Sequence, residues 1–598
     1  MRMTDTDPQL SWTEDDAPRS GRFGDVYFSA EDGLAETRAV FLDGCGLPEA
    51  WRGRRHFTVA ELGFGTGLNI AALLDLWRRQ GPADGRLSIF SVEGFPMRAE
   101  DAARALGRWP ELAAATQALT AGWPAPTPGF HRVDLPGFRA TLDLAVMDAR
   151  EALRAWSGPA DAWFLDGFAP AANPGMWSDE VLALVAARSA PGARAGTFTV
   201  AGSVRRGLQA AGFRVDKRPG FGRKRERLEA VLPGRPAPDR RPRVGIVGAG
   251  IAGASMARAL AALGCETCFI DQAGRGAGAS GNPAALVTPR FDAGGGPAAA
   301  LFAQAFQRAA GLYDALPGAV LATGALQLES GARDPARFDR IAAQPFWPEG
   351  ALARLDAAGA SAALGEDTGR GGMKLRDGRV IEPRMVLDAW LGAAEDLSGP
   401  NRRFERGGDA FRLTGEPGDG DQVDAVVIAA GWGLAALAPE LALTPARGQA
   451  SIAAGPAAGA AAWGGYVIPT RDGVLFGATF DRGDTGTDTR VEDHARNLAT
   501  LAEARPGLAA KLEDKPLDGR ARIRATTRDH LPFCGALAPG LWVLGGLGSR
   551  GFTTAPLLAE HLAALITGTP SPLPRAHAAL VEPSRPPATF ASAASALS

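Results

Sequence analysis

The sequence predicts two α/β domains in tandem, each built on a doubly wound and largely parallel sheet. Two glycine-rich loops carry this prediction, because each follows a short apolar run and precedes an alanine-rich stretch with helical spacing. The first loop follows residues 57–62 and the second follows residues 243–247. A strand, a glycine-rich turn and a helix form the first unit of a nucleotide-binding sheet. A chain of 598 residues also exceeds what one hydrophobic core supports.

The boundary between the two domains is predicted near residue 240. Residues 232–242 are rich in proline and charge, which is typical of a linker. We therefore expect a first domain over residues 1–240 and a second over residues 241–568. Proline, alanine and serine accumulate beyond residue 568, and this composition predicts a disordered tail over residues 569–598.

Composition indicates a folded protein of the cytoplasm. Hydrophobic residues make up 46% and charged residues 22% of the chain, and no apolar run approaches the roughly 20 residues of a membrane span. The polar, acidic start is unlike a signal peptide. Four cysteines suit a reducing compartment. Cys265 and Cys268 form a C-x-x-C inside an expected strand, so we expect a structural role for them and no metal site.

The first glycine-rich loop favours S-adenosylmethionine as its ligand. Gly63, Gly65 and Gly67 form a G-x-G-x-G pattern rather than the G-x-G-x-x-G of a dinucleotide fingerprint. Glycine is needed where the backbone turns tightly and lies against a ligand, since a Cβ atom would block the approach.

Acidic residues end the next three expected strands of the first domain. Glu93, Asp148 and Asp166 each close an apolar run. Ligands of doubly wound sheets bind at the carboxyl ends of strands, so these side chains should gather around the cofactor. We expect Glu93 to accept both ribose hydroxyls and Asp148 to contact the adenine.

Asp166 is the candidate for chemistry in this domain. Methyl transfer to an amine requires a neutral nitrogen whose lone pair faces the methyl group. A carboxylate beside the cofactor can take the ammonium proton and orient the nitrogen. Phe168 and Trp177 are candidates for stacking on an extruded base, with burial in the core as the alternative.

The second loop predicts a dinucleotide site. Gly248, Gly250 and Gly253 follow an apolar run directly, and Asp271 ends the next run. This context places the pyrophosphate at a helix N-terminus and Asp271 on the adenosine ribose. The fingerprint and the acid do not separate NAD from FAD.

Three later segments favour FAD. The loop 276–282 consists mostly of small residues, the run 423–432 ends in Ala-Ala-Gly-Trp, and the segment 541–552 is glycine-rich before an expected helix. Besides the fingerprint glycines and Asp271, we expect cofactor contacts from Ile251, Ala252, Ala279, Ser280, Gly281, Asn282, Gly548 and Gly551.

This second arrangement resembles the D-amino-acid oxidase and glycine oxidase superfamily. Residues 524–532 resemble the segment whose arginine binds the substrate carboxylate, which implies this role for Arg524. An arginine binds a carboxylate through two parallel hydrogen bonds. Ala525 follows it where glycine oxidases tend to have proline. Tyr466 is a second candidate contact; a surface ion pair for Arg524 and packing for Tyr466 are the alternatives.

A dense basic stretch runs from Arg205 to Arg243, although the net charge of the chain is only −2. A solvated face is the usual origin of such a run, and binding of an anionic polymer is its rival. The residues that we expect to contact an RNA backbone are Arg205, Arg206, Lys217, Arg218, Arg223, Lys224 and Arg225.

Several segments in their order resemble the bifunctional tRNA 5-methylaminomethyl-2-thiouridine biosynthesis proteins. They are residues 24–29 with 33–37, 61–69, 166–170 with 173–174, 220–226, 278–283 and 447–449. The resemblance implies a Rossmann-like class I methyltransferase domain fused to an FAD-binding α/β plus α+β domain of the D-amino-acid oxidase type. It also adds Glu61 and Asn69 to the expected cofactor contacts.

The resemblance further implies a substrate and two reactions. The substrate is tRNA whose wobble uridine carries a carboxymethylaminomethyl group, an N-alkylglycine. The FAD-dependent half would remove the carboxymethyl group, and the S-adenosylmethionine-dependent half would methylate the remaining amine, with the basic stretch on tRNA phosphates. Two alternatives stay open: a glycine or sarcosine oxidase fused to an unrelated methyltransferase, and a tRNA-binding protein with one decayed half.

Overall fold

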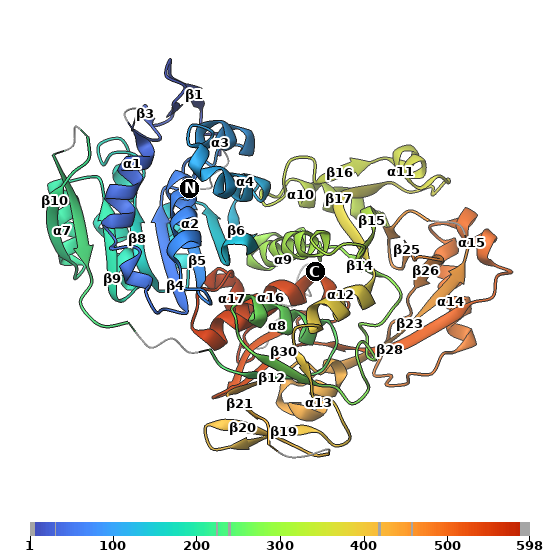
Figure 1. Cartoon of the computed structure of the whole chain (residues 1–598). Coiled ribbons are helices and arrows are strands. Elements are labelled where there is room, and N and C mark those ends of the chain that lie inside the picture. The colour runs from blue at the N-terminus through green and yellow to red at the C-terminus, as the bar shows by residue number, and fades with distance from the viewer. Residues whose placement is uncertain are drawn as a thin grey trace, which may run out of the picture. The chain divides into compact units, whose positions relative to one another are not determined.

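A computed structural model of the chain describes residues 6–29, 32–222, 225–236, 241–416, 420–455 and 458–586 (Figure 1). The chain divides into two compact units. The first comprises Met1–Arg240 with Thr567–Ala576, and the second comprises Arg241–Ile566 with His577–Ser598.

The first unit is built on an eight-stranded sheet in the order β10-β11-β9-β8-β4-β5-β7-β6. Its central strands β7, β5, β4 and β8 are neighbours and run parallel. The strands are β4 (His56–Leu62), β5 (Arg86–Glu93), β6 (Gly129–Leu135), β7 (Ala140–Val146), β8 (Ala160–Leu165), β9 (Ser189–Thr197), β10 (Arg214–Pro219) and β11 (Glu226–Val231).

Helices cover both faces of this sheet, because the strands are apolar on both sides. Successive residues of β5 alternate, so that Leu87 and Ile89 join one core cluster and Phe90 and Val92 the other. The first cluster also holds side chains of α2 and α4, and the second those of α5, α6 and α7. The helices are α1 (Gly33–Thr37), α2 (Leu68–Gln80), α3 (Ala99–Leu106), α4 (Ala113–Ala121), α5 (Ala149–Ala155), α6 (Asp179–Ala187) and α7 (Gly202–Ala210).

A short antiparallel meander precedes this sheet in the chain. It consists of β1 (Leu10–Trp12), β2 (Pro18–Ser20) and β3 (Asp25–Val26). No pattern in the sequence predicts these three strands.

The nucleotide-binding part of the second unit is a six-stranded sheet in the order β18-β13-β12-β22-β30-β29. The strands from β18 to β30 are parallel and β29 is antiparallel. They are β12 (Val244–Val247), β13 (Thr267–Ile270), β18 (Glu395–Asp396), β22 (Ala425–Ile428), β29 (Phe533–Ala538) and β30 (Leu541–Gly545).

A second, ten-stranded and mainly antiparallel sheet completes the unit. Its strands are β14 (Ala285–Val287), β15 (Val320–Leu328), β16 (Leu352–Leu355), β17 (Gly372–Ile381), β23 (Thr444–Ala454), β24 (Ala461–Ala462), β25 (Tyr466–Pro469), β26 (Gly473–Gly477), β27 (Asp481–Arg482) and β28 (Asp518–Thr526). A three-stranded sheet holds β19 (Arg403–Gly407), β20 (Ala410–Thr414) and β21 (Gln422–Val423). The helices are α8 (Ile251–Ala262), α9 (Gly296–Asp314), α10 (Asp334–Ala342), α11 (Ala357–Leu364), α12 (Pro383–Leu391), α13 (Leu434–Leu437), α14 (Val491–Ala502), α15 (Pro506–Leu512) and α16 (Gly551–Thr567).

The segment 447–449, one of those that carry the family resemblance, packs within this second sheet. Arg447 is fully buried, and its guanidinium donates to the Asp493 carboxylate at 2.5 Å, to the Asp488 carbonyl at 2.7 Å and to the Gln449 side chain at 3.2 Å. A buried arginine needs such partners, since an uncompensated buried charge is strongly destabilising.

The expectation of a disordered tail is wrong for residues 569–586. Residues 570–574 are buried, α17 spans Arg575–Val581, and the Arg575 guanidinium donates to the Trp156 carbonyl at 3.1 Å. Proline-rich composition is typical of disorder, whereas burial of Leu573 and of its neighbours orders this segment. Residues 587–598 lie outside the described residues.

Candidate functional site

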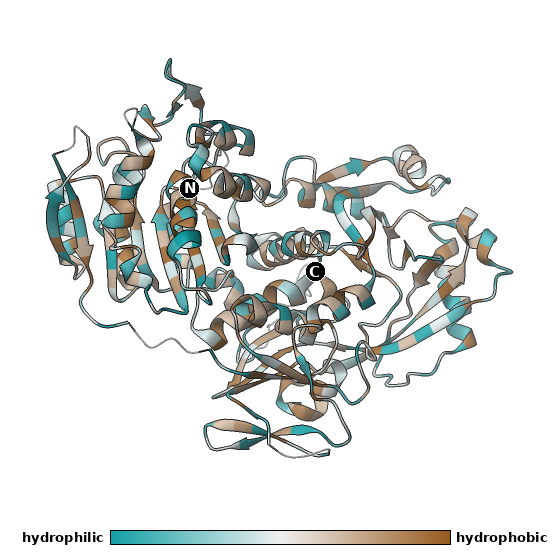
Figure 2. Cartoon of the chain, viewed as in Figure 1, coloured by the Kyte–Doolittle hydropathy of each residue, from teal (hydrophilic) through white to brown (hydrophobic). Residues whose placement is uncertain are grey.

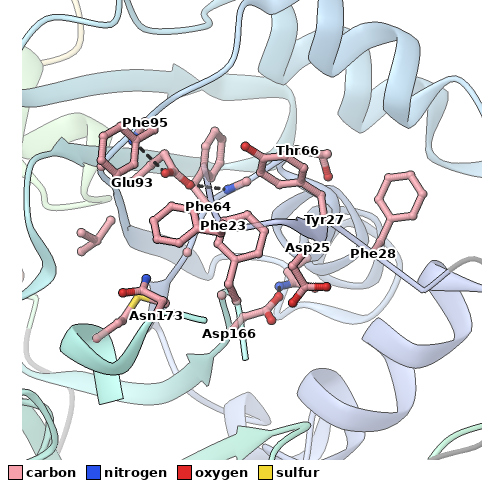
Figure 3. A pocket seen from close by; sticks show the side chains of 18 of the residues that line it. Phe23, Asp25, Tyr27, Phe28, Phe64, Thr66, Glu93, Phe95, Asp166 and Asn173 are labelled. Carbon is pink, nitrogen blue, oxygen red and sulfur yellow. Dashed lines mark hydrogen bonds between the residues drawn. The ribbon is translucent and has the colours of Figure 1, made fainter. Parts of the chain in front are cut away.

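A cavity of about 970 Å³ opens in the first unit at the carboxyl ends of β4, β5, β7 and β8. Gly63, Gly65, Glu93, Asp148 and Asp166 are among its lining residues, and Figure 3 shows the side chains of Glu93 and Asp166. The cavity thus brings together most of the residues that the sequence indicates for the S-adenosylmethionine site. Its size is that of sites which enclose a small-molecule ligand.

The glycine-rich turn between β4 and α2 leaves no room for side chains at its glycine positions. Gly63, Gly65 and Gly67 have φ angles of +85°, +53° and +79°. A Cβ atom on Gly63 would lie 2.8 Å from the Gly167 backbone, and one on Gly65 would lie 3.1 Å from the Tyr27 ring. Gly63 and Gly65 line the cavity without side chains, which fits the close approach of a nucleotide cofactor. Gly67 itself precedes α2 and lies against Phe64 and Trp123.

Glu93 and Asp148 stand at the cavity, each fixed by backbone amides. The Glu93 carboxylate accepts from the amides of Gly65 and Phe95, both at 2.9 Å (Figure 3). Burial raises the pKa of Glu93, and these amides oppose the shift. Asp148 caps α5 by accepting from the Arg150 amide at 2.9 Å. Each carboxylate oxygen has a second lone pair, so both groups retain acceptor capacity for cofactor hydroxyls and amines.

Asp166 is held by the side chain of Asn69. The Asn69 amide nitrogen donates to Asp166 Oδ2 at 2.7 Å and to Glu61 Oε1 at 3.1 Å. The Thr37 hydroxyl donates to the Asn69 carbonyl oxygen at 2.8 Å, which fixes the orientation of the amide. Asn69 was expected to contact the cofactor. Asn69 is among the residues that line the cavity, and its side chain also bridges two carboxyl groups, an arrangement that sequence spacing does not reveal.

Glu61 requires a correction, because its side chain does not reach the cavity. It is 0% exposed and accepts from the Ser91 hydroxyl at 2.5 Å as well as from Asn69. Burial raises the pKa of Glu61 well above its usual value, and the nearby Asp166 carboxylate adds to the shift. The expected cofactor contact is thus replaced by a buried network that supports Asp166.

Aromatic rings surround the cavity, and two of them come from the N-terminal segment. Phe23 stacks on Phe168 with ring centroids 4.7 Å apart, and Tyr27 meets Phe168 edge-on at 5.2 Å. Phe95 lies 5.8 Å from Phe23 (Figure 3). Trp177 is 6% exposed and donates to the Phe168 carbonyl, so it is a residue of the core. No spacing signal links Phe23 and Tyr27 to the strand-end acids, so the sequence analysis missed them.

The glycines between β12 and α8 in the second unit likewise leave no room for side chains. A Cβ atom on Gly248, whose φ is +114°, would lie 2.5 Å from the Ala429 carbonyl oxygen, and one on Gly253 would lie 1.9 Å from that of Gly248. Gly250 caps α8, and Ile251 and Ala252 begin the helix. Bare backbone at a helix N-terminus suits a pyrophosphate.

The remaining residues of the expected FAD site gather around this turn. Asp271 accepts from the Ala249 amide at 2.8 Å, and Ser280 accepts from the Ile251 amide at 3.0 Å. A Cβ atom on Gly551, where α16 begins, would lie 3.2 Å from Ile251. The amide of Gly548 donates to the Ala525 carbonyl at 3.0 Å, which joins the turn before α16 to β28. These contacts fit the FAD cradle that the sequence predicts.

Two arginines that no sequence motif indicates hold the loop 276–282. Arg520 donates to the carbonyls of Gly276, Ala277 and Gly278 and, at 3.3 Å, to the Asn282 side chain. Arg522 donates to the Ala277 carbonyl at 2.7 Å. Ala279 and Gly281 lie in this loop, and a Cβ atom on Gly281 would lie 2.1 Å from the Gly276 carbonyl oxygen. Positions two apart on a strand share a face, so β28 clamps the loop with one row of side chains.

Arg524 continues this row but has a different environment. It donates to the Thr479 carbonyl at 3.4 Å, and it forms no ion pair with a described carboxylate. Burial lowers the pKa of Arg524, whereas the neighbouring Tyr466 hydroxyl raises it. Burial also raises the pKa of Tyr466. The structure thus brings together the two residues that the sequence indicates for the substrate of the second unit.

The basic stretch is partly neutralised where the structure describes it. Lys217 pairs with Glu226 at 2.6 Å, and Arg218 lies 3.6 Å from Glu229. Arg206, Lys217, Arg218 and Arg225 are exposed and Arg205 is half-buried, while Arg223 and Lys224 lie outside the described residues. β10, which carries part of the stretch, is hydrophilic along most of its length (Figure 2).

Neither a metal cluster nor a membrane span is evident in the described part of the chain. No three His, Cys, Asp or Glu side chains there are arranged to hold a metal ion. No described helix combines the length and apolarity needed to cross a bilayer. Burial raises the pKa of Cys265 and of Cys268 to about 11, which disfavours the thiolate form.

Comparison with known proteins matches both units. The model of an S-adenosyl-L-methionine-dependent methyltransferase family matches residues 110–233, and that of an FAD dependent oxidoreductase family matches residues 243–565. A "tRNA 5-methylaminomethyl-2-thiouridine biosynthesis bifunctional protein MnmC" from Caulobacter sp. (strain K31) is 60% identical over 591 residues, which cover 96% of this chain and 97% of that protein. Its namesake from Caulobacter vibrioides is 58% identical over 96% of this chain and 97% of that protein. The crystal structure of iminodiacetate oxidase from Chelativorans sp. BNC1 matches 55% of this chain and 97% of its own, with a TM-score of 0.47 and 24% identity.

The fold, the two cradles, the two family models and the Caulobacter relatives define a bifunctional enzyme with an S-adenosylmethionine-dependent methyltransferase domain and an FAD-dependent oxidoreductase domain. The predicted fold class and the two cofactors are confirmed. The chain belongs to the family of tRNA 5-methylaminomethyl-2-thiouridine biosynthesis bifunctional proteins.

We expect Glu61→Gln to retain methyltransferase activity, because burial already favours the neutral carboxyl group at this position. When folding raises the pKa of a carboxyl group, the free energy of unfolding of the protein falls as pH rises above the pKa of the unfolded state, which is about 4.3. The variant lacks this loss, so its free energy of unfolding should rise relative to wild type between about pH 5 and about pH 8. Denaturant unfolding at both pH values measures the difference. An inactive variant with a constant difference would contradict the assignment.

Proposed function

We propose that the protein modifies the wobble uridine of tRNA in two steps. The second unit removes the carboxymethyl group from 5-carboxymethylaminomethyluridine, or from its 2-thio form, and leaves the 5-aminomethyl group. The first unit then methylates this amine to give 5-methylaminomethyluridine. The observation that carries the proposal is the 60% identity to a bifunctional relative over 96% of the chain, which includes both nucleotide cradles.

The first step needs a group that fixes the carboxymethyl end of the substrate. A two-electron oxidation at the N–CH₂ carbon gives an imine, and water hydrolyses the imine to the free amine and glyoxylate. FAD supplies the hydride acceptor when bound. We assign the substrate carboxylate to Arg524, because its guanidinium has no described carboxylate partner and can form two parallel hydrogen bonds. The Tyr466 hydroxyl is the second contact that we propose.

The second step needs a proton acceptor beside the amine. S-adenosylmethionine supplies the methyl group when bound. Asp166 lines the cavity next to the glycine-rich turn, and the Asn69 amide holds one of its carboxylate oxygens. A carboxylate in this place can take the ammonium proton and direct the nitrogen lone pair. The rings of Phe23, Tyr27 and Phe168 provide apolar faces on which the uracil can stack.

The exposed basic side chains Arg206, Lys217, Arg218 and Arg225 are the contacts that we propose for tRNA phosphates. The ion pair of Lys217 with Glu226 must open or be shared for this contact. We place the protein in the cytoplasm, in keeping with its four free and buried cysteines.

Nucleoside mass spectrometry of tRNA tests both steps together. A strain that lacks this gene should accumulate carboxymethylaminomethyl-uridine, and the wild-type gene should clear it. The Asp166→Asn variant should stop at the aminomethyl stage, because an amide cannot take the ammonium proton. Full methylation by this variant would remove Asp166 from the mechanism, and an unchanged nucleoside profile in the deletion strain would refute the proposed function.

Asn69→Leu keeps the side-chain volume and removes the amide that holds Asp166. We expect kcat for methylation to fall about tenfold, with little change in KM, for a hydrogen bond to a charged group worth about 1.5 kcal/mol. The acidic limb of the pH–rate profile should move to higher pH, since a carboxylate that loses a donor binds its proton more tightly. A purely structural role for Asn69 would lower stability and leave the profile in place.

Arg524→Lys keeps the positive charge and loses the planar pair of donors. We expect kcat/KM for the oxidation of tRNA to fall about 10- to 100-fold, the effect of about 1.5 to 3 kcal/mol for hydrogen bonds to a charged group. Steady-state release of glyoxylate measures the loss, and the visible flavin spectrum shows whether the cradle is intact. Wild-type kcat/KM in a variant with full flavin content would exclude Arg524 as the carboxylate ligand.

A further inference from the structure

One large apolar side chain stands out beside the oxidase site of the second unit. Phe480 lies between β26 and β27, and 47% of its surface is exposed. Single exposed apolar residues are common on soluble proteins, so exposure alone has no meaning. The position of this ring relative to Arg524 is what gives it significance.

Two arginines flank the ring. The guanidinium carbon of Arg524 and that of Arg482 each lie 5.9 Å from the centroid of the Phe480 ring. Arg524 also donates to the carbonyl of Thr479, the residue before Phe480, at 3.4 Å. The ring is therefore tied by both contacts to the arginine that we assign to the substrate carboxylate.

The charges around the ring leave these two arginines uncompensated. Asp481, next in the chain, is engaged by Arg496 at 2.9 Å and lies 3.9 Å from Arg447. Neither Arg482 nor Arg524 forms an ion pair with any carboxylate in the described ranges. An exposed aromatic face beside cationic side chains is the combination with which proteins stack unpaired nucleic-acid bases.

The length of the proposed substrate matches this arrangement. Four single bonds of about 1.5 Å each separate the carboxylate carbon from C5 of the uracil, a span of about 5 Å. A carboxylate held by Arg524 thus leaves the uracil within reach of a ring that lies 5.9 Å from the same guanidinium.

We propose that Phe480, with Arg482 beside it, is the stacking platform for the wobble uracil during oxidation. This inference rests on the proposed function and adds the element that separates a nucleic-acid substrate from a small amine. The platform holds the base while Arg524 holds the carboxylate, so the N–CH₂ group between them is fixed at both ends.

Anaerobic reduction of the flavin by tRNA from a strain lacking this gene tests the platform. The dependence of the reduction rate on tRNA concentration gives a Kd and a limiting rate. Base stacking on an aromatic side chain contributes about 1 to 3 kcal/mol. For Phe480→Ala we expect Kd to rise about tenfold and the limiting rate to stay within about twofold. Phe480→Tyr should keep the wild-type Kd, and Arg482→Gln should raise Kd and weaken its dependence on salt.

Leu437→Ala is the matched control, because Leu437 is 54% exposed elsewhere in the same unit and should leave Kd unchanged. A wild-type Kd for Phe480→Ala would overturn the platform and leave the proposed function intact. A fall in the limiting rate alone would also overturn it, since the ring would then shape the pocket instead of binding the base. If tRNA did not reduce even the wild-type flavin, the proposed function itself would fail.

Discussion

The glycines where two strands pass into helices, at which no side chain fits, are the constraint on which both sites depend. A Cβ atom on Gly63 would lie 2.8 Å from the backbone of Gly167, and one on Gly253 would lie 1.9 Å from the Gly248 carbonyl oxygen. No side chain fits at these glycine positions, where each strand passes into its helix. Since parallel strands end at one edge of a sheet, the same turns fix where acids and loops from other strands meet a ligand.

Around these rigid turns, the two units position their reactive groups in different ways. The first unit uses a buried network in which Thr37 orients Asn69 and Asn69 holds Asp166 and Glu61. The second unit uses a row of arginines on β28. Arg520 and Arg522 donate hydrogen bonds to the loop 276–282. Arg524, the third arginine of the row, neighbours Tyr466 instead. Position along one strand thus separates a structural arginine from one that we assign to the substrate.

The sequence predicted those features that local chemistry dictates. The glycines at 63, 65, 248 and 250 and the acids Glu93, Asp148 and Asp271 follow from strand–turn–helix spacing, and the structure brings each set together. The bridge through Asn69, the rings of Phe23 and Tyr27 and the clamp by Arg520 join residues far apart in the chain. Tertiary packing creates these contacts, and no spacing pattern encodes them. The prediction of a disordered tail was wrong for a related reason, because amino-acid composition does not show that residues 570–574 are buried.

The central claim is that one chain holds two independent nucleotide cradles of different specificity. Ligand stoichiometry in matched glycine variants tests it most directly, by the flavin absorbance of purified protein and by calorimetric titration with S-adenosylmethionine. Gly65→Val should abolish binding of S-adenosylmethionine and keep one FAD per chain, and Gly250→Val should do the reverse. Loss of both ligands in a folded single variant, or competition of the two ligands for one site in the wild type, would contradict the account.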